Sequence, residues 1–320
     1  VLRTAPVPMY LLSKKVREQG IKVVITGEGA DEILAGYNIF KEAKIRRFWA
    51  NCPGSEARPQ LLKKLYPYLP MMKEAKSSVL KMFFGFGLLQ TDDPYYSHML
   101  RWHNTSRIRT YFNEDFLSGA DTDFRKHLSK IAGDRFSSYD DLAQAQSLEF
   151  KVFMSNYLLS SQGDRMAMGN SVEGRYPFLD HRVIEFAAHL PERFKLNALN
   201  EKFILKKMMK GRIPESILTR NKQAYRAPVS ESFIGDSAPD YINEMLSEKS
   251  LKHFGYFEAL KVSKLIDKIK SGRLVSEIDQ MALAGILSTQ LLHHSLIEGN
   301  EPPGLKKGLR KMRVLKQPVA

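Results

Sequence analysis

Three carboxylates and two glycines share the short segment Thr26-Gly27-Glu28-Gly29-Ala30-Asp31-Glu32. Carboxylates bind cations or move protons, and glycines let a ligand approach the main chain closely. A helix beginning near Asp31 would add free N–H groups and the positive end of its dipole, which favour phosphate. Because three acids would repel a phosphate, at least one of them should hold a cation, usually magnesium, or transfer a proton. The segment therefore indicates a nucleotide and metal site.

An ordinary helix start is the competing interpretation of the same residues. In that case Asp31 and Glu32 only satisfy the free backbone N–H groups of the first helical turn. The heptapeptide alone does not separate the two interpretations, so the rest of the chain has to decide.

The elements around the turn fit an α/β unit. The segment 8–19 has helical spacing, residues 21–25 are a continuous β-branched strand, and Ile33, Tyr37 and Phe40 form a helical stripe. No second convincing strand follows, and the later periodic segments are helical, including a long helix near 275–297. Since one parallel strand cannot form a sheet, we expect its neighbours to come from outside these residues or from another chain.

Composition describes a globular protein with 320 residues, 43% of them hydrophobic. The single Cys52 excludes an intramolecular disulfide and indicates a reducing cytoplasm. No run of residues reaches the length of a membrane span, and the N-terminus does not resemble a signal peptide. We therefore predict a cytoplasmic protein with no membrane partner.

The net charge of +14 makes a polyanionic partner worth considering. Residues 301–320 alone hold six lysines and arginines against one glutamate, so the excess is concentrated at the end of the chain. No nucleic-acid motif or basic strand with interleaved aromatics is present, which leaves nucleic-acid binding a minor interpretation.

Two later segments are rich in charge. We interpret residues 160–182 as an interior loop pinned by ion pairs, with Asp164 and Arg165 lining a pocket and Asp180 capping the next helix. Residues 217–229 read as a basic loop in which Lys222, with nearby arginines, could stabilise charge on a phosphoryl or pyrophosphate group. A solvated basic loop is the alternative for this second segment.

Taken together, three motifs resemble the synthetase domain of the glutamine-dependent asparagine synthetase family. They are T-G-E-G-A-D-E, D-R-M-A-M-x-x-S-V-E-x-R-x-P-F-L-D-H-R and R-N-K-x-x-Y-R-A-P, in an order and spacing that agree across nearly the whole chain. The resemblance implies a partial ATP-pyrophosphatase domain, of the adenine nucleotide alpha hydrolase-like class, between α/β and mainly α. Residues 1–50 would form a partial α/β nucleotide-binding unit, residues 51–300 the helical region completing the same domain, and residues 301–320 a flexible basic tail.

The same resemblance implies a ligase that adenylates a carboxylate with ATP and Mg²⁺, releasing pyrophosphate. Glutamine-derived ammonia then displaces AMP to give an amide, as in asparagine biosynthesis. In this scheme Asp31 binds magnesium, Glu28 assists the attacking amine, and Lys222 neutralises the acyl-adenylate and the departing pyrophosphate. The residues that would bind the nucleotide are Thr26, Gly27, Glu28 and Gly29.

Two parts of the family pattern are absent from these residues: the pyrophosphate loop serine-glycine-glycine-x-aspartate-serine and the N-terminal glutaminase domain. The expected partners are therefore that missing segment, on the same or another chain, an aspartate-like carboxylate and glutamine-derived ammonia; homodimerisation is left open. We expect the 320 residues alone to be inactive. A relative that makes another amide, such as a β-lactam, a macrocyclic peptide or an amidated sugar or antibiotic precursor, and a split or degenerate non-catalytic subunit are the alternatives.

Overall fold

The computed structural model describes residues 2–67, 70–119, 123–220, 222, 227, 229–235 and 238–300. The chain divides into two units, one of residues 5–106 and 121–226, and the other of residues 1–4, 107–120 and 227–320. The domain boundaries expected at residues 50 and 300 stay predictions, and the basic tail 301–320 lies outside the described residues.

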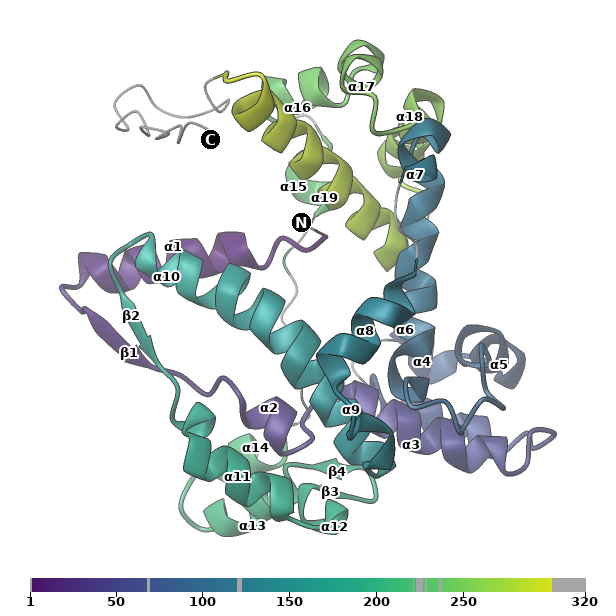
Figure 1. Cartoon of the computed structure of the whole chain (residues 1–320), viewed down its shortest axis with the longest axis vertical. Coiled ribbons are helices and arrows are strands. Elements are labelled where there is room, and N and C mark those ends of the chain that lie inside the picture. The colour runs from purple at the N-terminus through teal and green to yellow at the C-terminus, as the bar shows by residue number, and fades with distance from the viewer. Residues whose placement is uncertain are drawn as a thin grey trace. The chain divides into compact units, whose positions relative to one another are not determined.

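The larger unit holds both pairs of strands and most of the helices (Figure 1). Its first half runs α1 (Pro6–Glu18), β1 (Val23–Ile25), α2 (Ala30–Ile33), α3 (Asn38–Ala50), η1 (Arg58–Lys64), α4 (Pro70–Glu74), α5 (Ser77–Phe84) and α6 (Tyr96–Ser106). After residue 120 follow α8 (Phe124–Ala132), η3 (Phe136–Ser138), α9 (Asp141–Leu148), η4 (Glu149–Asp164), α10 (Arg165–Met168), β2 (Glu173–Arg175) and η5 (Pro177–Leu179). The last elements are α11 (His181–His189), α12 (Glu192–Lys195), β3 (Leu196–Asn197), β4 (Asn200–Glu201), α13 (Phe203–Met209) and α14 (Glu215–Leu218).

The smaller unit is helical apart from a single bridge between Phe112 and Phe257 among its described residues. Its elements are η2 (Arg107–Tyr111), α7 (Glu114–Ser118), α15 (Ser230–Phe233), α16 (Asp240–Met245), α17 (Glu248–Phe254), α18 (Ala259–Lys270), α19 (Glu277–Leu292) and η6 (His293–Ile297). Helix α19 starts with a capping box, in which Ser276 and Asp279 satisfy each other's backbone N–H groups. The long helix expected near 275–297 is confirmed by α19 and η6.

A two-stranded parallel sheet, β1 with β2, positions the turn at Thr26. Val24 lies opposite Gly174, and the N–H of Thr26 donates to the Arg175 carbonyl oxygen at 2.9 Å, which extends the pairing by one residue. The chain therefore leaves both strands side by side, at the end where open α/β sheets bind ligands.

The prediction that no second strand follows is wrong, because β2 forms at residues 173–175 and the short strands β3 and β4 pair with each other. The segment Glu173-Gly174-Arg175 forms β2, whereas the sequence placed it in an ion-paired loop. It has no β-branched residue and a central glycine, so propensity gave no strand signal, and pairing with β1 decides its conformation instead. The expected ion pairing is partly present, because Arg175 and Glu173 contact each other.

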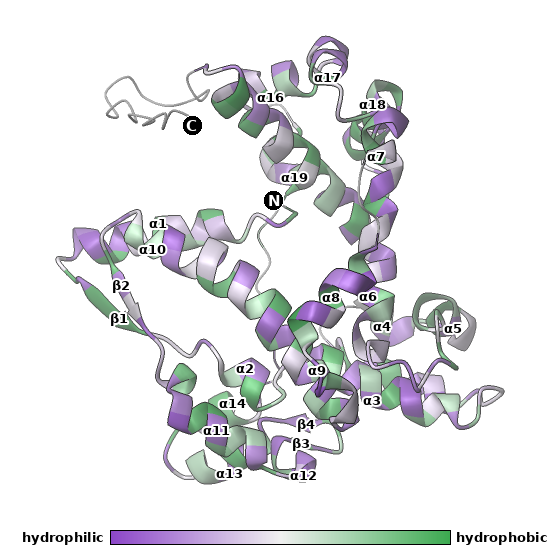
Figure 2. Ribbon diagram, in the orientation of Figure 1, coloured by the Kyte–Doolittle hydropathy of each residue, from purple (hydrophilic) through white to green (hydrophobic). Residues whose placement is uncertain are grey.

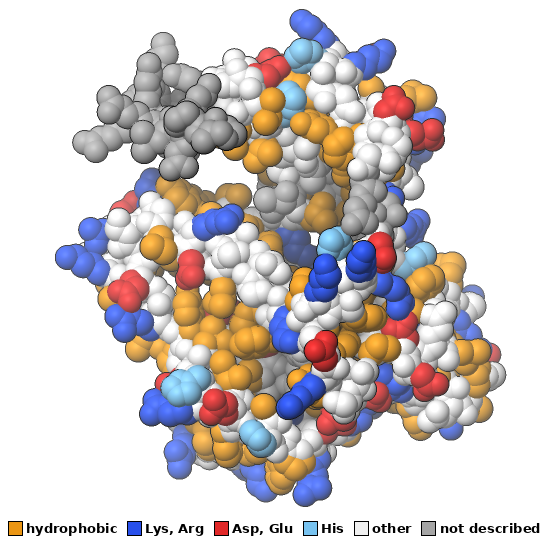
Figure 3. Space-filling view, viewed as in Figure 1, with side chains coloured by type: hydrophobic (Ala, Val, Ile, Leu, Met, Phe, Trp, Pro, Cys, Tyr) orange, Lys and Arg blue, Asp and Glu red, His pale blue; other side chains and the backbone are white. Residues whose placement is uncertain are grey.

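Strand β1 is apolar yet largely uncovered. Ile25 is 77% exposed and Val23 is also exposed, and Figure 2 shows the strand coloured as hydrophobic. Hydrophobic side chains reach the surface in the region of β1, β2 and η4 (Figure 3). An apolar strand exposed in this way is expected where the sheet continues beyond these residues.

The overall class, mainly helical with a small parallel α/β part, agrees with the expectation from the sequence. Helix α1 also forms where the periodicity placed it, with prolines in its first turn and Gly20 at φ 76° beyond its end. Among the described residues no helix is long and apolar enough to cross a membrane.

Candidate functional site

The two glycines of the turn do different things. Gly29 precedes α2 with φ 96°, and a Cβ there would lie 2.4 Å from Leu179 Cδ2, so both the backbone and the packing require glycine. A Cβ on Gly27 would meet nothing within 4 Å. Gly29 therefore shapes the turn, whereas Gly27 leaves open space beside the main chain.

Thr26 carries an unsatisfied polar atom at the end of β1. Its Oγ1 is buried and has no hydrogen-bond partner. Buried hydroxyl groups in native proteins are usually hydrogen-bonded, so an orphaned one calls for an explanation. A ligand bound at the carboxyl ends of β1 and β2 would supply the missing partner.

Two lysines hold the Asp31 carboxylate. Lys202 Nζ lies 2.8 Å from Oδ1 and Lys222 Nζ lies 3.0 Å from Oδ2. The Asp31 side chain is only 13% exposed, while Lys222 is 34% exposed and so reaches solvent. The small residue Gly36 makes the arrangement possible, because a Cβ there would lie 2.0 Å from Asp31 Oδ1.

The sequence analysis did not predict that Lys202 belongs to the site. It follows β4 and adopts φ 51°, an uncommon left-handed conformation for a lysine, with its N–H bonded to the Leu34 carbonyl oxygen at 3.1 Å. The preceding residue, Glu201, is buried and paired with Lys41 and Lys206, which fixes the start of α13. Nothing in the local sequence marks Lys202 as different from the other lysines, since only the fold brings it to Asp31.

Glu28 belongs to the same charge group. Burial raises the pKa of its carboxyl group, the nearby Lys222 ammonium opposes this, and the Asp31 carboxylate adds to it. The structure thus brings together three of the residues singled out in the sequence, Glu28, Asp31 and Lys222. Of the neighbouring arginines, Arg220 is exposed and Arg226 lies outside the described residues.

Glu32 is buried in the interior, unlike Glu28 and Lys222, which reach the surface. It is 1% exposed and accepts a hydrogen bond from the Tyr37 hydroxyl at 2.7 Å, while its carbonyl oxygen accepts one from Gln146. Burial is the main reason that the pKa of Glu32 rises to about 7. Glu32 therefore supports the turn from inside.

On the β2 side of the turn, the Tyr176 hydroxyl donates to Asp164 Oδ1 at 2.7 Å. A Cβ on Gly174 would lie 2.3 Å from this hydroxyl oxygen, so glycine is needed there. Burial and the Asp164 hydrogen bond raise the pKa of Tyr176, which keeps it protonated. The rim of the sheet thus has cations around Asp31 and hydrogen-bond acceptors around Asp164. Arg165, predicted to line a pocket with Asp164, is exposed.

The donor set decides which cation the site fits. Among the described residues no group of three or more His, Cys, Asp or Glu could hold a metal ion. Asp31 offers a single carboxylate that two ammonium groups already neutralise. Magnesium is commonly bound by one or two carboxylates together with substrate phosphates and water. These residues therefore fit a magnesium polyphosphate, whose oxygens would also attract the lysines, and not magnesium alone.

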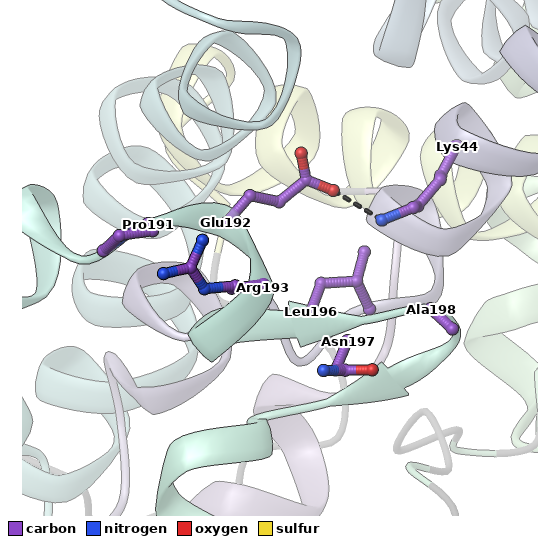
Figure 4. A pocket seen from close by; sticks show the side chains of 7 residues that line it. All are labelled: Lys44, Pro191, Glu192, Arg193, Leu196, Asn197 and Ala198. Carbon is purple, nitrogen blue, oxygen red and sulfur yellow. Dashed lines mark hydrogen bonds and ion pairs between the residues drawn. The ribbon is translucent and has the colours of Figure 1, made fainter.

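Two open cavities of the larger unit lie away from these residues. One, of about 380 Å³, is crossed by the Lys44–Glu192 ion pair at 2.6 Å (Figure 4). The other, of about 520 Å³, is lined by residues including Glu201 and Lys206. Neither contains a residue predicted to bind nucleotide or metal, so the candidate site is the open rim of β1 and β2.

Comparison with known proteins places the chain in a family. The sequence model of asparagine synthase matches residues 1–294. Asparagine synthetase (glutamine-hydrolysing) 1 of Bacillus subtilis is 25% identical over 276 residues, which cover 85% of this chain and 41% of the relative. The amidase chyE of Penicillium rubens is 27% identical over 282 residues, covering 80% of this chain and 39% of the relative.

A putative asparagine synthetase of Mycobacterium bovis is 26% identical over 226 residues, covering 70% of this chain and 32% of the relative. The chain thus spans about two-fifths or less of the length of these relatives. The residues matched by the family model, 1–294, include the turn after β1, both strands of the parallel sheet and the two lysines that hold Asp31. This chain belongs to the asparagine synthase family, as its three motifs predicted.

Proposed function

We propose that the complete protein is an ATP-dependent, amide-forming ligase of the asparagine synthetase type. It activates a carboxylate as its acyl-adenylate, releases pyrophosphate, and forms the amide with glutamine-derived ammonia. The observation that carries the proposal is the Asp31 carboxylate held between Lys202 and Lys222 at the carboxyl end of β1. Family membership supports the reaction class.

Each residue has a task in the first step. The substrate carboxylate attacks the α-phosphorus, and the bond to the β-phosphate oxygen breaks. Lys222 and Lys202 neutralise the negative charge on the departing pyrophosphate, a form of electrostatic stabilisation that loses 10²-fold or more when one donor is removed. Bound magnesium would neutralise further phosphate charge, and Asp31 would hold it. Thr26, Gly27 and Gly29 form the wall beside the nucleotide.

Glu28 serves the second step. Ammonia attacks the acyl carbon, AMP leaves, and one proton of the amine passes to the Glu28 carboxylate. Burial, which raises the pKa of Glu28, makes it a better proton acceptor than an exposed glutamate. The pair Tyr176 and Asp164 adds acceptors on the same rim, where N–H groups of an amine can be bound.

The substrate carboxylate and the remaining partners belong to the same proposal. Aspartate is the first carboxylate to test. If it is the substrate, the protein serves asparagine biosynthesis, and we expect this reaction in the cytoplasm. The amidases among the relatives favour a second candidate, an amide made on another carboxylate. The missing pyrophosphate loop and glutaminase domain would be supplied by a segment of the same or another chain. Without them, the 320 residues are expected to be inactive.

Product analysis tests the reaction class. The complete protein is incubated with ATP, magnesium, glutamine and a panel of carboxylates, and products are identified by mass spectrometry. We expect AMP, pyrophosphate and the amide of one carboxylate in equal amounts. Formation of ADP and phosphate would contradict adenylation, and no nucleotide turnover with any carboxylate would favour a non-catalytic subunit. Pyrophosphate release by the 320-residue chain alone would contradict its expected inactivity.

A further inference from the structure

The Lys222 ammonium has a second neighbour besides Asp31. Its Nζ lies over the ring of Tyr37, 5.6 Å from the ring centroid, while the ion pair to Asp31 Oδ2 is 3.0 Å long. A cation within about 6 Å of an aromatic face is attracted by the negative charge of that face. The ammonium is therefore held from two directions, by a carboxylate and by a ring.

The Tyr37 ring is fixed by its own contacts. It stacks on Phe40 with centroids 6.2 Å apart and meets the edge of Phe153 at 6.3 Å. At its far end, the hydroxyl is bonded to Glu32 Oε1 at 2.7 Å, and Glu32 is buried. A ring held on two sides and at its tip is a fixed platform, whereas the lysine chain above it is free to bend.

One short segment supplies both contacts of Lys222. Asp31 and Tyr37 are joined through Gly36, whose N–H donates to the Asp31 carbonyl oxygen at 2.7 Å. The left-handed residue before it, Ala35, turns the chain so that α3 starts at Asn38. The spacing between the carboxylate and the ring is thus built into the loop between α2 and α3.

We propose that Tyr37 is a positioning residue whose anchored ring keeps the Lys222 ammonium at the Asp31 site. The inference rests on the role of Lys222 in the proposed function. When a polyphosphate competes for the ammonium, Lys222 exchanges its contact with Asp31 for one with phosphate while the ring keeps it in place. The hydroxyl of Tyr37 acts on the ring and not on the ligand.

Lysine reactivity tests this contact without any ligand. The complete protein without nucleotide is labelled with trace acetic anhydride, and mass spectrometry gives the acetylation rate of each lysine. The variants are Tyr37→Leu, which removes the ring, and Tyr37→Phe, which keeps it. Tyr10→Leu, at an exposed tyrosine of α1, is the matched control.

We expect Lys222 in Tyr37→Leu to react about 2- to 5-fold faster than in the parent chain, because without the ring its side chain is held less firmly beside Asp31 and is more open to the reagent. Lys202, which contacts Asp31 without an aromatic platform in the described residues, should change less than about 2-fold. Tyr37→Phe should stay nearer to the parent than Tyr37→Leu, and Tyr10→Leu should match the parent.

An unchanged Lys222 rate in a folded Tyr37→Leu chain would overturn the inference. Lys41, buried in its ion pair with Glu201, reports folding, since its labelling rises only when the unit opens. If Tyr37→Leu exposes Lys41, Tyr37→Met, whose longer and more flexible side chain can fill the space of the ring, is used in its place with the same criterion. Protection of Lys222 by magnesium pyrophosphate in the complete protein tests the proposed function separately, so either idea can fail alone.

Discussion

Two carboxylates of the larger unit are held by cations in opposite ways. Asp31 is paired with two lysines, one of which is about a third exposed, and it lies at the open rim of the sheet. Glu149, 1% exposed, is bonded to Arg101 Nη1 at 2.9 Å and lies 3.3 Å from His98 Nε2 inside the helical layer. The two lysines end in flexible chains that can bend toward a ligand. At Glu149 the His98 ring is buried, and Arg101, whose side chain is 44% exposed, is fixed by its bond to the carboxylate.

The protonation of the Glu149 group fits a structural role. Burial disfavours the charged forms of both Glu149 and His98. For Glu149 the His98 hydrogen bond and the Arg101 charge outweigh burial, so its pKa lies below the usual range. For His98 burial prevails and lowers the pKa, so the ring is neutral. The two groups thus differ in their cations: two lysines pair with Asp31, whereas Glu149 has Arg101 and a neutral His98.

The largest effect on stability is expected when the buried group around Glu149 loses Arg101. Arg101→Met leaves the Glu149 carboxylate buried without its main counter-charge, which costs several kcal/mol for a fully buried pair. Because Arg101 is partly exposed, we expect the free energy of unfolding to fall by about 3 kcal/mol. Chemical denaturation of parent and variant checks this. A loss as small as that of a surface substitution would show that Glu149 does not depend on Arg101.

Glu32, the residue next to Asp31, should make the free energy of unfolding depend on pH. Its pKa is about 7 in the folded state against 4.5 as the ordinary value, so its contribution is complete below pH 4.5 and is lost as pH rises through 7. Glu32→Gln removes this loss. Relative to the parent, the variant should gain about 2 kcal/mol of unfolding free energy between pH 5 and pH 8. If the free energy of unfolding changed with pH in the same way in both chains, the raised pKa of Glu32 would be contradicted.

A smaller effect is expected from Gly36→Ala. The added Cβ would overlap Asp31 Oδ1 and Lys202 Cε, so the ion pairs must shift. We expect a loss of about 1–2 kcal/mol, measured by thermal unfolding. Gly27→Ala is the matched control, because its Cβ points into open space and should leave stability unchanged. Equal effects of both substitutions would mean that the Asp31 site is not closely packed.

The smallest stability effect is expected from Lys222→Met. Lys222 reaches solvent and Asp31 keeps Lys202, so the change should cost less than about 1 kcal/mol. Chemical denaturation next to Arg101→Met makes the contrast direct. A loss similar to that of Arg101→Met would show that the two groups are held alike and that Lys222 is structural.

The sequence predicted the parts whose signals are local. The β-branched strand, the glycine turn and the capped helices follow from residue types at short spacing, and the motifs indicated the family. Strand β2 was missed because Glu173-Gly174-Arg175 has no strand propensity and forms only by pairing with β1. Lys202 was missed because its approach to Asp31 depends on the β3–β4 hairpin and on a left-handed backbone that no local residue type reveals.

We propose that Asp31 and its two lysines bind the phosphates of ATP. The most direct test of this proposal is the carboxylate-dependent exchange of labelled pyrophosphate into ATP by the complete protein, compared with its Lys222→Met and Asp31→Asn variants. Both variants should lose at least about 100-fold of the exchange rate while hydrolysing glutamine like the parent. Exchange at the parent rate in either variant would contradict the account.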